Sequence, residues 1–318
     1  MFVLLGSNGQ ITAQIACHLL DAGHPVRVVG RSPGALSPLA NAGARIAAGD
    51  PGDPVFLARA FEDATAVYTM IPPCYDEPNM RAAQDRIGTA IAQALRRARV
   101  QRVVNLSSIG AERPQGTGPI EGLHAQEKRL DAIGGMHLLH LRPGSFMENL
   151  LPAAATVAAA DILPGLEAAD AVIPMVATRD IAAVAAEELT TPRHQGQLIL
   201  HAARHVSMRE AAAALGKAIG KPNLPYVQSE PAAARVALLA HGLSADAADQ
   251  LAALARWLST APLDSVGVAP VAVQPTTIEA FARERFAAAF AEAQRAALGS
   301  AHGKPLTSRR RRSSTMSM

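Results

Sequence analysis

The first thirty residues carry the pattern that most restricts the fold of this chain. An apolar run from Phe2 to Leu5 is followed by a turn with two glycines, an alanine-rich segment and a second apolar run from Pro25 to Val29. A strand, a glycine turn, a helix and a second strand make the βαβ unit of about 30 residues that binds dinucleotide phosphates. The glycines let a phosphate approach the backbone N–H groups at the helix N-terminus. The predicted cofactor contacts in this turn are Gly6, Ser7, Asn8, Gly9, Gln10 and Ile11.

One position of the turn departs from the dinucleotide fingerprint. Thr12 stands where a third glycine is expected, so the helix must pack against the strand with a larger side chain. The turn therefore has two interpretations, a dinucleotide site or a Rossmann-like scaffold without a nucleotide. The strand before the turn and the helix after it favour the dinucleotide site.

The end of the second strand distinguishes between the two nicotinamide cofactors. This strand ends at Gly30-Arg31-Ser32, and no acidic residue occurs between His24 and Ala48. The ribose 2′-hydroxyl of NAD usually meets an acid here, whereas an arginine can pair with the 2′-phosphate of NADP through charge-assisted hydrogen bonds. Arg31 therefore favours NADP(H) over NAD(H), and the alternative is a solvated arginine at a strand end.

The alternation of strands and helices continues to about residue 150. Further apolar runs occur at residues 44–48, 66–71, 102–107 and 137–142, with helical patterns between them. This order predicts right-handed crossovers and an α/β fold with a Rossmann-like, doubly wound parallel sheet. Ligands of such sheets bind beyond the carboxyl ends of the strands. The further cofactor contacts predicted at this edge are Asp50, Ile71, Pro72, Pro73 and Ser107.

The pattern changes in the second half of the chain, where strands are short and helices dominate. We expect an NAD(P)-binding domain at residues 1–150 and a smaller, mostly helical substrate-binding domain at 151–300, some of whose elements return to the core. Residues 301–318 are expected to form a disordered basic tail. The second half has no metal-ligand spacing, and the segment from Thr276 to Glu279 has the pattern of a capping box for a last helix.

Charge and cysteine content narrow the cellular context. Five of the 30 basic residues lie from Lys304 onward, where there is no acid, so residues 1–303 hold 25 basic and 27 acidic side chains. A near-neutral fold, and a tail without an aromatic or helical motif, predict no specific nucleic-acid partner. No apolar stretch reaches the roughly 18 residues of a membrane span and no signal-peptide pattern is present, so we expect a cytoplasmic protein. Cys17 is expected to be buried in a helix, and Cys74 to lie in a loop near the cofactor.

The helix expected from Ile120 to Ile133 carries the candidate catalytic residues. A short-chain dehydrogenase protonates its substrate with a tyrosine placed four residues before a lysine on this helix. The three tyrosines of this chain lie elsewhere, and the helix has His124 and Lys128 instead, four residues apart on one face. With Ser107 or Ser108 at a strand end, His124 is a candidate proton donor or hydrogen-bond partner of the nicotinamide or substrate. The alternative is an ordinary helix histidine and an ordinary strand-end serine.

Several further motifs belong together with the glycine turn and Arg31. They are the segment from Val103 to Ala111, His124 and the stretch Leu141-Arg-Pro-Gly-Ser-Phe-Met-Glu-Asn149, and in the second half residues 173–182 and 276–281. Together these motifs resemble the NmrA-like family of atypical short-chain dehydrogenases, in particular its quinone-oxidoreductase type. The resemblance implies an NADP-binding Rossmann-like domain, a small C-terminal domain and NADPH-dependent reduction of a quinone or related electrophile by direct hydride transfer. It also implies that some members are redox sensors that catalyse nothing.

Two functions follow from these observations. In the first, Pro143, Gly144 and Phe146 lie near the nicotinamide, and His124 or solvent gives the proton to a small quinone-like molecule. In the second, the protein is a catalytically silent NADP(H) sensor that binds a protein partner, because no committed acid–base pair is present. Neither function involves a metal or a membrane, and both are compatible with a homodimer. A nucleic-acid-binding function rests only on the arginine tail.

Overall fold

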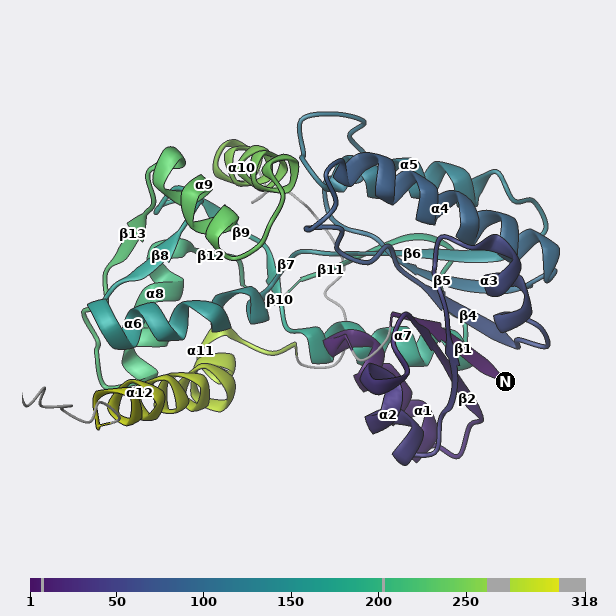
Figure 1. The fold of residues 1–318 in the computed structure, drawn as a ribbon, viewed down its shortest axis with the longest axis horizontal. Helices are drawn as coiled ribbons and strands as arrows, with labels where there is room; N and C mark the ends of the chain where they lie inside the picture. Colours follow the sequence, from purple (N-terminus) through teal and green to yellow (C-terminus); the bar gives the residue numbers. More distant parts are fainter. Residues whose placement is uncertain (7–8, 202–203, 262–274, 303–318) are drawn as a thin grey trace, which may run out of the picture.

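The computed structural model describes residues 1–6, 9–201, 204–261 and 275–302, and a parallel sheet of seven strands forms its centre (Figure 1). The strand order is β11-β6-β5-β4-β1-β2-β3, and all neighbouring pairs are parallel. The order changes direction between β1 and β4, which is where such sheets bind ligands. The predicted doubly wound α/β fold is therefore confirmed. The strands are β1 (Phe2–Leu5), β2 (Val26–Gly30), β3 (Arg45–Ala48), β4 (Ala66–Thr69), β5 (Arg102–Leu106), β6 (His137–Pro143) and β11 (Gly196–Leu200).

Helices cover both faces of this sheet (Figure 1). One face carries α1 (Gln10–Asp21), α2 (Pro33–Asn41) and α7 (Thr178–Thr190), and the other carries α3 (Pro54–Ala60), α4 (Met80–Arg97) and α5 (Ile120–Asp131). Strands buried on both faces need apolar side chains at every position, which explains the unbroken Val and Leu runs. Asp53 caps α3 as its pattern indicates, because its carboxylate accepts hydrogen bonds from the N–H groups of Val55 (2.8 Å) and Phe56 (3.2 Å).

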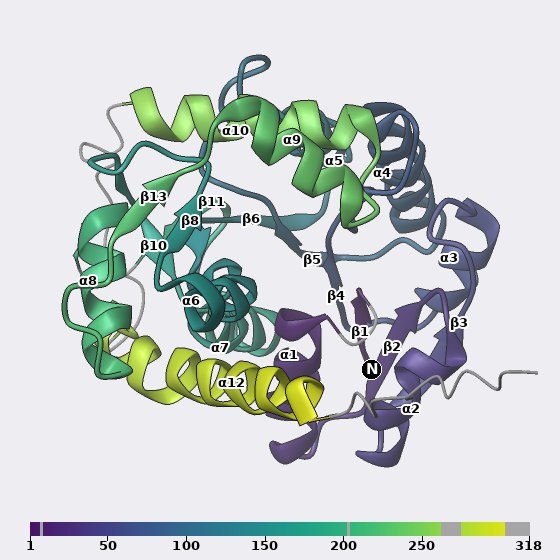
Figure 2. The ribbon, with the colours of Figure 1, turned by 60° about the vertical axis from the view of Figure 1, so that its left-hand side comes forward.

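The second half of the chain contributes to the sheet and also forms a core of its own. Strand β11 pairs with β6 at the sheet edge, and α7 packs against α1, so these two elements return to the first half. The second core lies under α6 (Ala154–Ala160), α8 (Met208–Ala218) and α10 (Ala245–Thr260) (Figure 2). The domain boundary near residue 150 stays a prediction.

The remaining described elements of the second half are further helices and three short strand pairs. Helix η1 (Met147–Ala153) leads into α6, α9 (Pro231–Ala240) precedes α10, and α11 (Ile278–Phe281), η3 (Ala282–Phe286) and α12 (Ala287–His302) follow one another at the end. Three two-stranded pairs join distant segments of this half. They are β7 (Ser145–Phe146) with β10 (Met175–Val176), β8 (Leu163–Gly165) with β13 (Tyr226–Gln228), and β9 (Val172–Ile173) with β12 (Val206–Ser207).

Two local predictions were wrong. Cys17 is exposed, because α1 turns its neighbours Ile15, Ala16 and Leu19 toward the sheet and Cys17 lies on the opposite face. The last helices have no capping box of the expected form: Thr277 is the N-cap and accepts a hydrogen bond from Ala280 N, whereas the Thr276 hydroxyl donates to Asp180 Oδ1 (2.9 Å).

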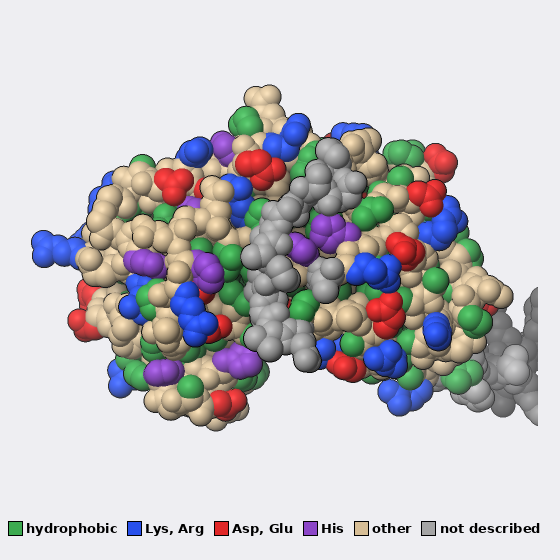
Figure 3. Space-filling view, turned by 180° about the vertical axis from the view of Figure 1, so that it is seen from behind, with side chains coloured by type: hydrophobic (Ala, Val, Ile, Leu, Met, Phe, Trp, Pro, Cys, Tyr) green, Lys and Arg blue, Asp and Glu red, His purple; other side chains and the backbone are tan. Residues whose placement is uncertain are grey.

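The surface agrees with the near-neutral charge of residues 1–303. Acidic and basic side chains alternate over the face that Figure 3 shows. Among the described residues, no helix combines the length and the apolar character that crossing a membrane requires. The basic tail after residue 302 lies outside the described residues.

Candidate functional site

Two adjoining cavities lie at the carboxyl edge of the sheet. The first, about 330 Å³, is lined by the glycine turn and Arg31, and we call it the glycine-turn cavity. The second, about 250 Å³, is lined by residues of α5 and α10 that include Trp257, and we call it the tryptophan cavity. The two cavities share one wall, so ligands in them would lie on either side of it. This wall consists of Met70, Pro72, Pro73, Leu106, Phe146 and Asn149.

The glycine turn accommodates Thr12 because Gly6 has no side chain. Gly6 has a φ of +140°, and a Cβ on it would lie 2.4 Å from Thr12 Oγ1. The Thr12 side chain is buried in this space, and Gly9 N donates to Gly6 O (3.2 Å) across the turn. Thr12 thus packs under the turn without closing it. Gln10 and Ile11 line the cavity, their contact with a cofactor stays a prediction, and Ser7 and Asn8 lie outside the described residues.

Replacing Gly6 with alanine is expected to destabilise the protein more than the same change at Gly23. Both glycines have a positive φ, but nothing lies within 4 Å of a Cβ on Gly23. The strained backbone costs on the order of 1–3 kcal/mol at either site, and only Gly6→Ala adds a collision with Thr12. Urea unfolding of the two variants measures the difference. Equal losses of unfolding free energy would show that the turn moves aside at no cost.

Arg31 lies at the end of β2 with its side chain exposed and lines the glycine-turn cavity. Within the described residues it has no carboxylate partner. The nearby Asp50 is occupied, since Arg86 Nη1 donates to its Oδ2 (3.2 Å) and Gly52 N to its Oδ1 (2.8 Å). Burial raises the pKa of the Cys74 thiol beside this hollow, which keeps it protonated, and its Sγ donates to Pro72 O. The cation is therefore free to meet an anionic ligand group.

The glycine-turn cavity also has a polar residue with an unused hydroxyl. Tyr68 of β4 is fully buried and lines this cavity, and its hydroxyl has no hydrogen-bond partner among the described residues. Burial raises the pKa of this phenol, so it is neutral. A buried hydroxyl without a partner costs free energy unless a ligand or water supplies one. A turn in which Gly6 and Gly9 carry no side chain, together with an unpaired cation, fits a phosphorylated dinucleotide.

The tryptophan cavity is lined mainly by apolar side chains. Ile120 and Leu123 come from α5, and Leu254, Trp257 and Leu258 come from α10. No charged residue is found among the described residues that line it. The polar groups at its wall are uncharged, and they are Tyr75, Gln84, Ser107, Ser108, Ser145 and Asn149.

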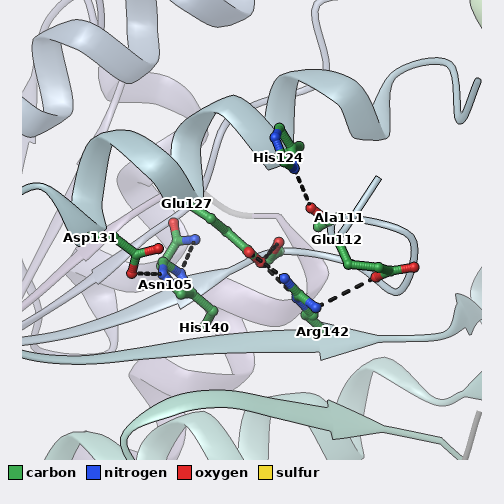
Figure 4. A network of polar contacts seen from close by, with 9 residues as sticks. Asn105, Ala111, Glu112, His124, Glu127, Asp131, His140 and Arg142 are labelled. Carbon is green, nitrogen blue, oxygen red and sulfur yellow. Dashed lines mark hydrogen bonds and ion pairs between the residues drawn. The ribbon is translucent and has the colours of Figure 1, made fainter. Parts of the chain in front are cut away.

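Ser107 is held by a buried ion pair rather than by a histidine. Figure 4 shows the two members of that pair, Glu127 and Arg142. Its hydroxyl donates to Glu127 Oε1 (2.5 Å), and Arg142 donates from Nε to the same oxygen (2.9 Å) and from Nη2 to Oε2 (2.5 Å). Burial alone raises the pKa of the Glu127 carboxyl, but hydrogen bonds from Arg142 and Ser107 outweigh this and hold the pKa below its usual range. Because the Ser107 hydrogen points to a carboxylate, its oxygen can only accept hydrogen bonds from the cavity.

His124 does not meet Ser107. Its Nδ1 lies 2.7 Å from Ala111 O, to which it donates, and the residue lines neither cavity (Figure 4). Lys128, one turn later, is exposed. His124 thus stands on α5 where the tyrosine of a short-chain dehydrogenase is expected, but it binds the loop at Ala111. The role of His124 as a proton donor stays a prediction without geometric support.

The other predicted contacts are placed unevenly. Pro72, Pro73 and Phe146 lie in the wall between the cavities, and Ile71 lines only the tryptophan cavity. Pro143 lines neither cavity. It ends β6, where it pairs with β11 in the sheet, and its carbonyl accepts a hydrogen bond from Ile109 N (3.0 Å). No cluster of three His, Cys, Asp or Glu side chains suited to a metal ion occurs in the described part of the chain.

Sequence reasoning missed Glu127 and the role of Trp257, and it used Arg142 only as a strand end. Arg142, a charged residue inside an apolar strand, is the signal from which a buried ion pair could have been predicted, since such a charge needs a partner. A second series of side-chain hydrogen bonds lies next to the Glu127–Arg142 pair. Thr69 Oγ1 donates to Asn105 Oδ1 (3.0 Å), Asn105 Nδ2 lies 3.1 Å from His140 Nδ1, and His140 Nε2 lies 3.1 Å from Asp131 Oδ1.

Comparison with known proteins identifies relatives along most of the chain. The model of the NmrA-like family matches residues 2–282. A (4-alkanoyl-5-oxo-2,5-dihydrofuran-3-yl)methyl phosphate reductase of Streptomyces griseus is 30% identical over 241 residues, 76% of this chain and 81% of that protein. An NAD(P)H azoreductase of Xenophilus azovorans is 30% identical over 261 residues, 80% of this chain and 87% of that protein. The structure of an NADPH-dependent quinone oxidoreductase from Escherichia coli, complexed with NADPH, matches with a TM-score of 0.67 at 21% identity, over 90% of this chain and 100% of that one.

Proposed function

We propose that this chain, which belongs to the NmrA-like family, is an NADPH-dependent reductase that transfers hydride directly to a quinone or similar electrophile. The observation that carries the proposal is the pair of adjoining cavities, one with an unpaired Arg31 and one with uncharged walls. The names of three relatives support the reaction class, because each is a reductase or oxidoreductase.

The glycine-turn cavity would hold the cofactor. The backbone N–H of Gln10, where α1 begins, suits the pyrophosphate, and Arg31 suits the 2′-phosphate. NADPH, when bound, supplies the hydride. The chain contributes binding and orientation. Phe146 and Pro72 belong to the wall that the two cavities share, so they would lie between the cofactor and the acceptor.

The tryptophan cavity would hold the acceptor. Its apolar walls suit a flat ring placed against the shared wall, and proximity is the main requirement of hydride transfer. A quinone takes up one hydride and one proton to give the hydroquinone. Ser107 cannot donate that proton, because its hydrogen points to Glu127, but it can accept a hydrogen bond from the hydroquinone hydroxyl. The proton therefore comes from solvent.

Cofactor titration and turnover test the proposal together. We expect NADPH to bind at least about tenfold more tightly than NADH, because charge-assisted hydrogen bonds each contribute roughly 1.5–3 kcal/mol. NADPH oxidation should follow the addition of 1,4-benzoquinone or a naphthoquinone. Equal affinity for both cofactors would refute the assignment of Arg31, and absence of oxidation with every quinone tested would refute the reductase.

A catalytically silent NADP(H) sensor is the second candidate. It is favoured by one observation, that no described Asp, Glu, His, Lys or Arg lines the tryptophan cavity. It predicts tight NADP(H) binding, no turnover, and a protein partner whose binding differs between NADP⁺ and NADPH. Measurable turnover with any quinone would exclude it.

A further inference from the structure

We propose that the indole of Trp257 is the wall that sets the length of the acceptor. This inference rests on the proposed function, because it assigns the tryptophan cavity to the acceptor. On its other side, Trp257 lines a groove of about 880 Å³ between α9, α10 and β13. Of the described residues, Trp257 alone lines both hollows. The indole therefore stands between a smaller cavity and a much larger groove.

The indole is fixed in place by its surroundings. Trp257 is only 8% exposed, and Gly110 lies against the ring with a φ of +86°. A Cβ on Gly110 would come within 2.6 Å of the ring, so the indole packs directly on bare backbone. The beginning of α10 is tied to the first half of the chain, because Ser244 N donates to Tyr75 O (2.7 Å) and Met80 N to Asp246 Oδ2 (2.8 Å). The start of the helix that carries Trp257 is thus fixed to the first half of the chain.

The small size of the tryptophan cavity means that the Trp257 wall limits the length of an acceptor. Pockets for drug-sized ligands usually measure roughly 300–1,000 Å³, and the tryptophan cavity, at about 250 Å³, lies below that range. It suits an uncharged acceptor of one ring or two fused rings without a long substituent. The groove beyond the indole is apolar along Leu166, Pro231, Ala252 and Leu238, so it could take an alkyl tail if the indole were absent. Loss of the indole should thus join the two hollows and admit longer acceptors.

The test compares two quinones on the full-length protein with NADPH. One is 1,4-benzoquinone, and the other is a benzoquinone with a ten-carbon tail. Trp257→Ala should raise the ratio of kcat/KM for the tailed to the untailed quinone by at least about tenfold, since fit of even one methylene changes selectivity by that order. Trp257→Phe keeps a ring in the wall, and Leu238→Ala changes only the groove, so both should stay within about threefold of the original ratio. An unchanged ratio in Trp257→Ala overturns the proposal.

Stability and binding are measured alongside turnover. Because Trp257 belongs to the core, each variant is first checked by thermal unfolding, and Trp257→Leu replaces Trp257→Ala where the latter does not fold. Trp257 is the single tryptophan of the chain, so its fluorescence reports on the cavity directly. Saturable quenching of the original protein by the short quinone and not by the tailed one supports the wall. Quenching by both at similar concentrations overturns it.

The binding readout separates this inference from the proposed function. If the short quinone quenches saturably but no NADPH is oxidised with either quinone, the reductase fails and the assignment of Trp257 as the wall is tested by binding alone. Calorimetric titration of Trp257→Ala with the tailed quinone then decides the remaining point. New binding supports the wall, and absence of binding overturns it.

Discussion

An Arg31→Asp variant is expected to lose NADPH affinity by at least about 100-fold, with little change in NADH affinity. Two charge-assisted hydrogen bonds to a phosphate contribute about 3 kcal/mol or more together, and the aspartate adds repulsion between like charges. The loss can be this large because Arg31, which lines the cavity, forms no ion pair with a carboxylate among the described residues. Titration followed by cofactor fluorescence measures both affinities.

The matched control is Arg45→Asp. Arg45 begins β3, so it lies at the amino ends of the strands, whereas the cavities lie at their carboxyl ends. Its side chain is exposed. This variant makes the same charge change and should leave both affinities within about twofold, since exposed charges beyond the Debye length of roughly 10 Å are screened. Thermal unfolding of Arg31→Asp should stay near that of the original protein. Unchanged NADPH binding in a folded Arg31→Asp would place the 2′-phosphate elsewhere.

The strands and the cofactor turn could be predicted because their signals are local. An apolar run such as Phe2 to Leu5 forms a buried strand, and Gly6 adopts a positive φ that its own conformational freedom allows. The cap at Asp53 is local in the same sense. Even the departure at Thr12 has a local answer, because the side chain fills space that Gly6, six residues before it, leaves open.

The polar centre of the site could not be predicted, because it depends on how α5 is rotated against the sheet. His124 and Glu127 lie three residues apart, and the sequence does not say which of them faces Ser107. The rotation is set by burial of Ile120, Gly122 and Leu130, which turns Glu127 inward and leaves His124 at the loop. A helix phase error of this kind also explains why Cys17 was placed on the wrong face of α1.

Trp257 escaped prediction for a different reason. It lies about 150 residues along the chain from Ser107, on a helix whose amphipathic pattern indicates burial but not what it covers. Its position follows from long-range contacts, such as those of Ser244 with Tyr75 and of Gly110 with the indole. Pattern therefore specifies the cofactor half of the site, and tertiary packing specifies the acceptor half.

Replacing Glu127 with alanine is expected to lower the free energy of unfolding by about 3–5 kcal/mol, because it leaves the buried Arg142 without its partner. The control is Glu112→Ala, which removes the exposed partner of the same arginine, 3.5 Å from Nη1, and should cost no more than about 1 kcal/mol. Urea unfolding at pH 7 measures both. Similar small losses in the two variants would mean that Arg142 finds solvent when Glu127 is gone.

The same pair has a pH dependence whose sign is fixed by Glu127. Its carboxyl has a native pKa below the ordinary value of about 4.3, so the unfolded chain takes up this proton first as the pH falls. The stability that Glu127 contributes is therefore complete above about pH 5 and is lost as the pH drops through its native pKa. Glu127→Gln has no such proton to take up. The stability gap between the original protein and Glu127→Gln should narrow from pH 6 to pH 3.5 in urea unfolding, whereas a constant gap would show that Glu127 is not the carboxylate that titrates.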